Sequence, residues 1–183
     1  FTFIVFDGQY TSNADVSLTV DAVNDAPVLA TVSDVSFDED TSTSITLSGS
    51  DVDQDALTFS IEGGADITAI LDGSDITFSA PGNYNGSETF TITITDGELT
   101  DSQTITAIVN PVNDVPVATA GLSGTTNEDQ AIVITLAGSD IDGDALTFSL
   151  DTDASNGDVV IDGNLATYTP TLNYNGDDSF TFT

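Results

Sequence analysis

The sequence has no positively charged side chain: its 183 residues include no Lys, Arg or His, against 31 Asp and Glu. No side-chain ion pair can therefore form within the chain. Binding to nucleic-acid phosphates or to an anionic membrane surface is all but ruled out, because both depend on Lys and Arg. The formal net charge of −31 also leaves a self-repulsion that only cations from outside can relieve.

Cysteine is absent too, which excludes a disulfide framework and thiolate chemistry. The apolar runs are far shorter than the roughly 20 residues of a membrane-spanning helix, and no signal peptide is visible. The 39% of hydrophobic residues are well patterned, which favours a folded chain over a disordered one. Since the sequence begins at Phe1, we expect it to be a piece of a longer protein.

The chain repeats itself with a period of 89 to 90 residues. Val23–Val28 returns as Val112–Val117 and Gly49–Ser60 as Gly138–Ser149, both 89 residues later, and the Asn-Tyr-Asn-Gly segment that begins at Asn83 returns after 90. This period predicts three segments. They are the C-terminal part of one repeat (1–25), a complete repeat (26–114), and most of a third (115–183) that is truncated in its sixth strand.

The pattern within each repeat is that of β-strands. Phe90, Ile92 and Ile94 alternate with threonines, the period of two that a half-buried strand requires. Turn signals such as Asp72-Gly73 and Asp96-Gly97 separate the apolar stretches, and no stretch has helical periodicity. Further strands are expected at 45–47, 57–61, 76–78 and 105–109. Six or seven short strands in about 90 residues indicate an all-β chain of tandem antiparallel sandwiches of the immunoglobulin-like type.

Many of the 26 Asp residues fall at strand ends, whereas the outward strand positions are mostly Thr and Ser. Asp51 and Asp53 form an Asp-x-Asp pair with Asp55 two residues further on, and the repeat brings this arrangement back at 140, 142 and 144. Calcium takes six to eight oxygen ligands, and the short Asp side chain holds a carboxylate close to the backbone as such a site needs. The alternative is that these residues only form ordinary Asx turns.

Strand alternation predicts which of these loops share an end of the sandwich, because successive antiparallel strands end on opposite sides. Asp51, Asp53 and Asp96 should lie beside Asn24 and Asp25, where the chain enters the repeat. Glu39, Asn83 and Asn85 should lie at the opposite end, near the exit at 113–114. Carboxylates from successive repeats would then meet at each junction, where like charges about 4 Å apart repel by about 1 kcal/mol per pair even in water. A calcium ion bound between these carboxylates would neutralise their charges and so remove the repulsion.

These motifs resemble the cadherin superfamily, and specifically the bacterial cadherin-like tandem repeats of large secreted adhesins of the RTX type. The family pattern has a Glu after the first strand, an Asp-x-Asp after the second, an Asp after the sixth and an Asn-Asp linker. The resemblance implies calcium ligation between successive domains. The candidate ligands are Asp7, Asn24, Asp25, Glu39, Asp40, Asp51, Asp53, Asp55, Asn83, Asn85, Asp96, Asn113, Asp114, Glu128, Asp140, Asp142 and Asp144.

The sequence departs from the family pattern before the sixth strand, where Asn83-Tyr84-Asn85 has two neutral amides in place of two carboxylates. The linker is also a residue shorter and lacks its leading Asp. Fewer charged ligands imply one or two ions per junction, or weaker binding. Zinc is disfavoured by the lack of His and Cys.

The leading functional hypothesis is a calcium-stiffened structural spacer within an extracellular adhesin or filament at the cell surface, whose partners are the adjacent repeats of the same chain. One alternative is an adhesive or carbohydrate-binding module that engages surface glycans or proteins through its loops. Another is strand exchange between copies in a filament. An enzyme is disfavoured, because there is no usual nucleophile–base pair and no cationic group to stabilise developing negative charge.

Overall fold

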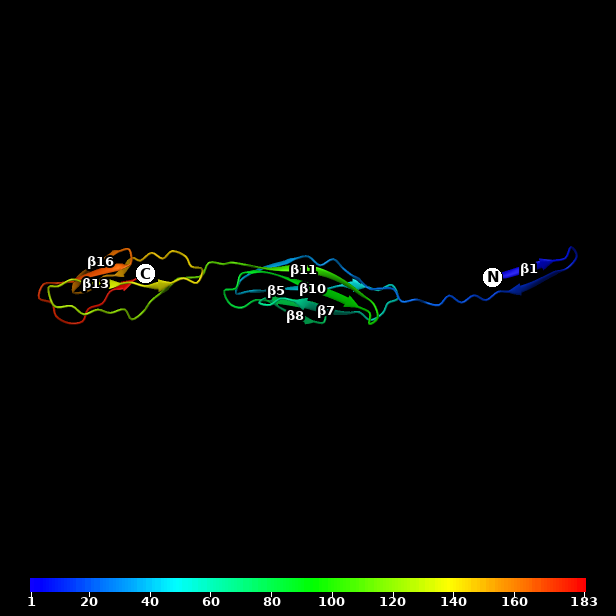
Figure 1. Ribbon diagram of the computed structural model, residues 1–183, viewed down its shortest axis with the longest axis horizontal. Coiled ribbons are helices and arrows are strands. Elements are labelled where there is room, and N and C mark those ends of the chain that lie inside the picture. The colour runs from blue at the N-terminus through cyan, green and yellow to red at the C-terminus, as the bar shows by residue number, and fades with distance from the viewer. The chain divides into compact units, whose positions relative to one another are not determined.

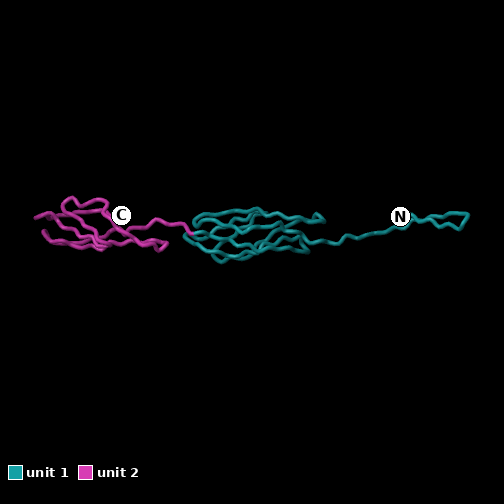
Figure 2. Tube along the Cα trace, turned by 90° about the horizontal axis from the view of Figure 1, so that it is seen from above, with its two compact units in different colours: residues 1–110 teal, residues 111–183 magenta.

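The computed structural model describes residues 1–183 and contains β-strands joined by turns and loops, with no helix (Figure 1). The all-β prediction is therefore confirmed. The chain divides into two compact units, unit 1 (Phe1–Asn110) and unit 2 (Pro111–Thr183) (Figure 2). The three-segment division at 25 and 114 stays a prediction. The structure has no helix of the length and apolar character needed to cross a bilayer.

Unit 1 begins with a hairpin of two antiparallel strands, β1 (Thr2–Phe6) and β2 (Thr11–Asp15). Every residue of both strands is exposed. In its register Thr2 lies opposite Asp15, and 89 residues later Thr91 lies opposite Thr104 in the same kind of hairpin. The opening segment is thus the structural counterpart of a hairpin in the next repeat.

The rest of unit 1 is a sandwich of two sheets. One sheet has the order β4-β11-β10-β7 and the other β5-β9-β8, while β3 pairs with β6. Only β4 and β11 are parallel. The strands are β3 (Val28–Leu29), β4 (Val35–Asp38), β5 (Ser42–Thr46), β6 (Gly49–Ser50), β7 (Thr58–Gly63), β8 (Thr68–Asp72), β9 (Asp75–Ser79), β10 (Gly86–Thr95) and β11 (Thr100–Asn110).

The core of unit 1 lies between these sheets, where the alternating apolar residues of each strand meet. Phe90, Ile92 and Ile94 of β10 are buried while the threonines between them are more accessible, as the alternation predicts. From the opposite sheet Ile76 and Phe78 fill the space, and the rings of Phe78 and Phe90 meet edge to face at 5.3 Å. This packed core fixes the positions of the loops at both ends.

Unit 2 repeats the plan with fewer strands. Its sheets are β13-β17-β16, β15-β18 and β12-β14. The strands are β12 (Val117–Ala118), β13 (Ile132–Thr135), β14 (Gly138–Ser139), β15 (Leu150–Thr152), β16 (Gly157–Asp162), β17 (Leu165–Pro170) and β18 (Thr181–Phe182). Its buried cluster is smaller and is centred on Leu136, Val159 and Ala166. No strand of unit 2 occupies the place that β11 has beside β10 in unit 1.

Candidate metal centre

Three carboxylates of unit 1 meet in the loop that follows β6. Each of Asp51, Asp53 and Asp55 offers an oxygen, and the three oxygens all lie within 4.8 Å of one another. The loop turns around Asp51, whose Oδ1 accepts the N–H of Asp53 at 2.8 Å and that of Asp55 at 3.4 Å. Gln54, between them, has a positive φ of 67°. We call these three side chains the Asp51 cluster.

The second oxygen of Asp51 is the unusual atom of the cluster. Oδ2 is buried and has no hydrogen-bond partner in the structure. A buried carboxylate oxygen without a donor is costly, and most buried polar atoms do have a partner. The cluster therefore holds an acceptor that no group of the protein satisfies.

The segment that leads into the sandwich is attached to this cluster. The N–H of Asp25 donates to Oδ2 of Asp53 at 2.8 Å, and Nδ2 of Asn24 donates to Oδ2 of Asp96 at 2.9 Å. Asn24, Asp25 and Asp96 thus lie at the same end of unit 1 as the Asp51 cluster. The cluster sits where the chain enters the repeat.

Asp96 is held by the turn between β10 and β11. Its Oδ1 accepts the N–H groups of Leu99 and Glu98, both at 2.7 Å. These bonds, that of Leu99 foremost, together with the Asn24 amide lower the pKa of Asp96 below its ordinary value, because they favour the charged form. The side chain therefore stays anionic and oriented.

Asp7 occupies the same position in the β1–β2 turn. Its Oδ1 accepts the N–H of Tyr10 at 2.6 Å and of Gln9 at 2.9 Å, which lowers the pKa of Asp7 in the same way. The structure does not gather it with other candidate carboxylates. In this hairpin the aspartate orders the turn.

Unit 2 repeats the backbone arrangement of the cluster. Oδ1 of Asp140 accepts the N–H groups of Asp142 at 3.0 Å and Asp144 at 3.2 Å, and the N–H of Asp114 donates to Oδ2 of Asp142 at 2.7 Å. The nearby Asn113 donates its side-chain amide to the carbonyl of Asp114 at 2.8 Å. We call Asp140, Asp142 and Asp144 the Asp140 cluster.

At the opposite end of unit 1 another group of candidates comes together. The N–H of Asn83 donates to Oδ1 of Asp40 at 3.0 Å, and the N–H of Glu39 donates to the carbonyl of Asn110 at 2.9 Å, where β11 ends. Glu39 is the charged residue in the buried set, with 3% of its surface exposed. Asn85, two residues after Asn83, is exposed. This end therefore carries a buried carboxylate beside the exit of the chain.

The corresponding end of unit 2 keeps only part of this arrangement. The N–H of Asn173 donates to Oδ1 of Asp129 at 2.7 Å, as Asn83 does to Asp40. Glu128, the counterpart of Glu39, is exposed. In unit 1 the end of β11 lies against Glu39, whose N–H donates to the Asn110 carbonyl.

Glu88 holds a loop through its carboxylate, a role that the sequence pattern did not predict. This side chain accepts N–H groups from Ala65, Asp66 and Ile67 at 2.8 to 3.0 Å. The bonds, led by that of Asp66, lower the pKa of Glu88 below its ordinary value.

Asp178 holds the corresponding loop of unit 2 by accepting hydrogen bonds. It accepts the N–H groups of Ser155 and Asn156 and the hydroxyl of Tyr168. Its signal was in the sequence, because an acidic residue follows the Asn-Tyr-Asn-Gly segment by two positions in both repeats.

Comparison with known proteins places the chain in a family. The sequence pattern of the family described as bacterial Ig domain matches residues 24–108 and 113–183. The chain belongs to this bacterial Ig domain family. Its two matched stretches are the two sandwiches described above. A search of curated proteins finds no match to the chain.

Among solved structures, this pair of bacterial Ig domains is similar to EC1-2 of human protocadherin-24, form II, at 17% identity with a TM-score of 0.59. The match covers 87% of this chain and 86% of that one. The likeness to cadherin domains in fold is thus confirmed. An endo-fucoidan hydrolase of glycoside hydrolase family 107 matches 99% of the chain at 20% identity and a TM-score of 0.39, and the chain spans 31% of its length. The chain is therefore a tandem of bacterial Ig domains with a cadherin-like fold.

Proposed function

We propose that the Asp51 cluster binds calcium and that the chain is a calcium-stiffened spacer of an extracellular adhesin or filament. The observation that carries the proposal is Oδ2 of Asp51, which is buried without a hydrogen-bond partner next to two more carboxylates. Three like charges within 4.8 Å repel one another by about 1 kcal/mol per pair even at the dielectric constant of water. A cation would relieve this repulsion and give the unpaired oxygen a partner.

The donor set fits calcium better than other common metals. The candidate ligand atoms at this end of unit 1 are oxygens of carboxylates and of the Asn24 side-chain amide, which suit a hard cation. Asp51, Asp53 and Asp55 would hold the ion, with Asp96 and Asn24 supplying further oxygens beside them. Zinc sites draw on His and Cys, and the chain has neither.

Binding at this place would restrain the linker. The N–H of Asp25 already donates to Asp53 in unit 1, and that of Asp114 donates to Asp142 in unit 2. An ion held by either cluster would fix the segment that enters its repeat. Because repeats in such arrays contact only their neighbours, the linkers determine how stiff the array is. Ligation by Glu39 and Glu128 across junctions, as the cadherin pattern implies, is part of this proposal.

The location follows from the same chemistry. Extracellular calcium modules bind with dissociation constants of about 10⁻⁴ to 10⁻³ M, so their sites fill outside the cell and stay empty in the cytosol. Bacterial Ig-like domains are usually extracellular or surface-exposed. We therefore place the chain at the cell surface, in a structural and not an enzymatic role.

Calorimetric titration with calcium tests the proposal. The variant Asp51→Asn keeps an oxygen to accept the N–H groups of Asp53 and Asp55 but replaces the other carboxylate oxygen with an NH₂ group. We expect it to bind calcium at unit 1 at least about tenfold more weakly, a loss of about 1.4 kcal/mol.

The matched control is Asp72→Asn, which removes the same charge from the exposed last residue of β8, outside the cluster. Its affinity should stay within about twofold of the unchanged chain. Equal affinities for both variants would contradict the assignment of the site.

A further inference from the structure

Each sandwich has an edge strand that pairs with a neighbour on one side only. In unit 1 this strand is β8, which pairs with β9 and lies at the margin of the unit (Figure 1). In unit 2 it is the counterpart β16, which pairs with β17. The outer side of an edge strand presents main-chain N–H and C=O groups with which another strand can pair.

The register of the sheet shows which main-chain groups of β8 face outward. The loop after β5 donates an N–H to the carbonyl of Ser74 at 2.7 Å, so the main chain of Ser74 faces β5. Successive residues of a strand face opposite neighbours, so Thr77, three positions further on, faces β8 and is paired there with Ile70. The main-chain groups of Ala69 and Leu71, on either side of Ile70, therefore point away from the sheet. No hydrogen bond within the chain uses them.

In unit 2 a side chain closes the same edge. The N–H of Val159, which takes the place of Ala69, donates to Oδ1 of Asp153 at 3.1 Å. The corresponding loop of unit 1 has Gly63 and Gly64 at this point, and neither has a side chain that could act as a cap. The edge is thus open in unit 1 and capped in unit 2.

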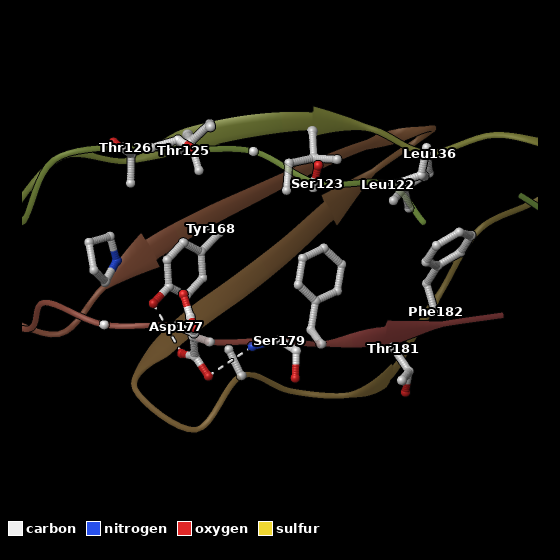
Figure 3. A pocket seen from close by; sticks show the side chains of 18 of the residues that line it. Leu122, Ser123, Thr125, Thr126, Leu136, Tyr168, Asp177, Ser179, Thr181 and Phe182 are labelled. Carbon is white, nitrogen blue, oxygen red and sulfur yellow. Dashed lines mark hydrogen bonds between the residues drawn. The ribbon is translucent and has the colours of Figure 1, made fainter. Parts of the chain in front are cut away.

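Both loops beside the edges are held in place, so the difference between the edges lies in the side chains. In unit 2 Asp178 accepts two N–H groups of the loop and the hydroxyl of Tyr168. Figure 3 shows Tyr168 pointing toward the segment that carries Asp177 and Ser179 (Figure 3). In unit 1 Glu88 holds the loop through three N–H groups.

We propose that β8 of unit 1 pairs with β8 of a second copy of this chain, antiparallel and centred on Ile70. The outward main-chain groups of Ala69 would exchange hydrogen bonds with those of Leu71 in the second copy, and those of Leu71 with Ala69. The two sheets would then form one continuous sheet, as in other cases of strand addition at an edge. Both copies use the same surface, so the contact is isologous and closes as a dimer.

The outer side chains of β8 are complementary to themselves in this register. Ile70 is 61% exposed and would pack against Ile70 of the second copy. Thr68 would lie opposite Asp72, and a pair of this kind already occurs within the chain. The hydroxyl of Thr46 donates to Oδ1 of Asp75, directly opposite it, at 2.6 Å. In a chain without cationic side chains, a hydroxyl group can provide the donor that a cross-strand aspartate needs.

Strand β16 lacks this complementarity. Asp158 takes the place of Thr68 and Asp162 that of Asp72. The same register centred on Val160 would therefore set carboxylates directly opposite one another, which is destabilising. The pairing is thus specific for unit 1, and the match of β8 with itself favours a second copy over an unrelated partner.

Sedimentation equilibrium of the 183-residue chain tests the proposal. It is best done in chelator, because the pairing needs no metal, and in about 0.15 M salt, which screens the repulsion between the acidic copies to about 8 Å. We expect the average mass to rise with concentration from 18.9 kDa toward twice that value and not beyond it.

Ile70→Asp sets two carboxylates against each other at the centre of the contact and should weaken dimerisation at least about tenfold. The matched control is Val160→Asp, the same kind of change at the exposed counterpart on the capped edge. It should dimerise within about twofold of the unchanged chain. Thr68→Asp should weaken the dimer as Ile70→Asp does, and it copies the residue that unit 2 tolerates at this place.

Amide hydrogen exchange identifies the surface involved. The amides of Ala69 and Leu71 should exchange more slowly as the concentration rises, whereas that of Val159 should not change. A chain that stays monomeric up to about 1 mM overturns the proposal. Equal dimerisation of the Ile70→Asp and Val160→Asp variants also overturns it, as does association that leaves the amides of Ala69 and Leu71 unprotected.

Discussion

At the scale of single residues, the aspartates of this chain divide their two oxygens between two tasks. Oδ1 of Asp51 and of Asp96 accepts backbone N–H groups and shapes the local turn. Oδ2 of Asp96 accepts the Asn24 amide, while Oδ2 of Asp51 has no partner. A side chain can therefore form an Asx turn and still present an oxygen to a cation, so the two interpretations of the Asp-x-Asp motif do not exclude each other.

Glu88 gives a prediction about acid stability. Its folded-state pKa lies below the ordinary value of about 4.3, so its contribution to stability is complete above that pH and is lost as the pH falls through the lowered pKa. Glu88→Gln should lower the free energy of unfolding by about 1 kcal/mol at pH 7, because neutral hydrogen bonds replace charge-assisted ones.

The difference between Glu88→Gln and the unchanged chain should shrink as the pH drops below about 4. Urea unfolding at several pH values measures it. Glu62→Gln, at an exposed position of β7, is the control and should unfold like the unchanged chain. A difference of the same size at all pH values would show that Glu88 acts through something other than its charge.

At the scale of strands and turns, the 89- to 90-residue repeat predicted more of the structure than the strand and turn preferences of single residues did. The alternation at Phe90–Ile94 predicted β10, and the returning segments predicted which loops would look alike. Strand β8 was not predicted, because Thr68–Asp72 is short and lies close to two turns. Glu62-Gly63-Gly64 has the glycines typical of a turn, but pairing with β10 extends β7 through Gly63.

The order of the strands along the sequence predicted which candidate ligands would share an end of the sandwich. Strand alternation predicted that Asp51, Asp53 and Asp96 would lie beside Asn24 and Asp25, and the structure brings them together in this way. The burial of Asp51 Oδ2 and of Glu39 could not be predicted, because it depends on the tertiary packing around them and not on the local sequence pattern.

The loop that Glu88 holds makes a prediction about backbone conformation. Gly64 has a φ of +75°, and a Cβ added there would lie 2.6 Å from the ring of Phe90. Gly73 has a φ of +64°, but its Cβ would meet nothing within 4 Å. Gly73→Ala should therefore cost only the backbone strain of about 1 kcal/mol, whereas Gly64→Ala should cost at least about 1 kcal/mol more. Thermal or urea unfolding of both variants measures this, and equal costs would contradict the packing described here.

At the scale of the whole molecule, a net charge of −31 with no compensating cation makes the chain's dimensions depend on the ions around it. If calcium restrains the linkers, small-angle scattering should give a longer and more uniform particle in calcium than in chelator. The double variant Asp51→Asn with Asp140→Asn should behave in calcium as the unchanged chain does in chelator. An identical maximum dimension in calcium and in chelator would contradict the spacer function while leaving the sandwich fold intact.

The calcium site is tested most directly by amide NMR spectra of the chain recorded during a calcium titration. The account predicts that the amides of Asp25, Asp53 and Asp55, which donate to the carboxylates of the Asp51 cluster, shift first, with a midpoint of about 10⁻⁴ to 10⁻³ M calcium. The amides of Ala65 and Ile67, which donate to Glu88 elsewhere, should stay in place. Amides of the cluster that do not move up to about 10 mM calcium, or that move no more than the rest of the acidic surface, would contradict the account.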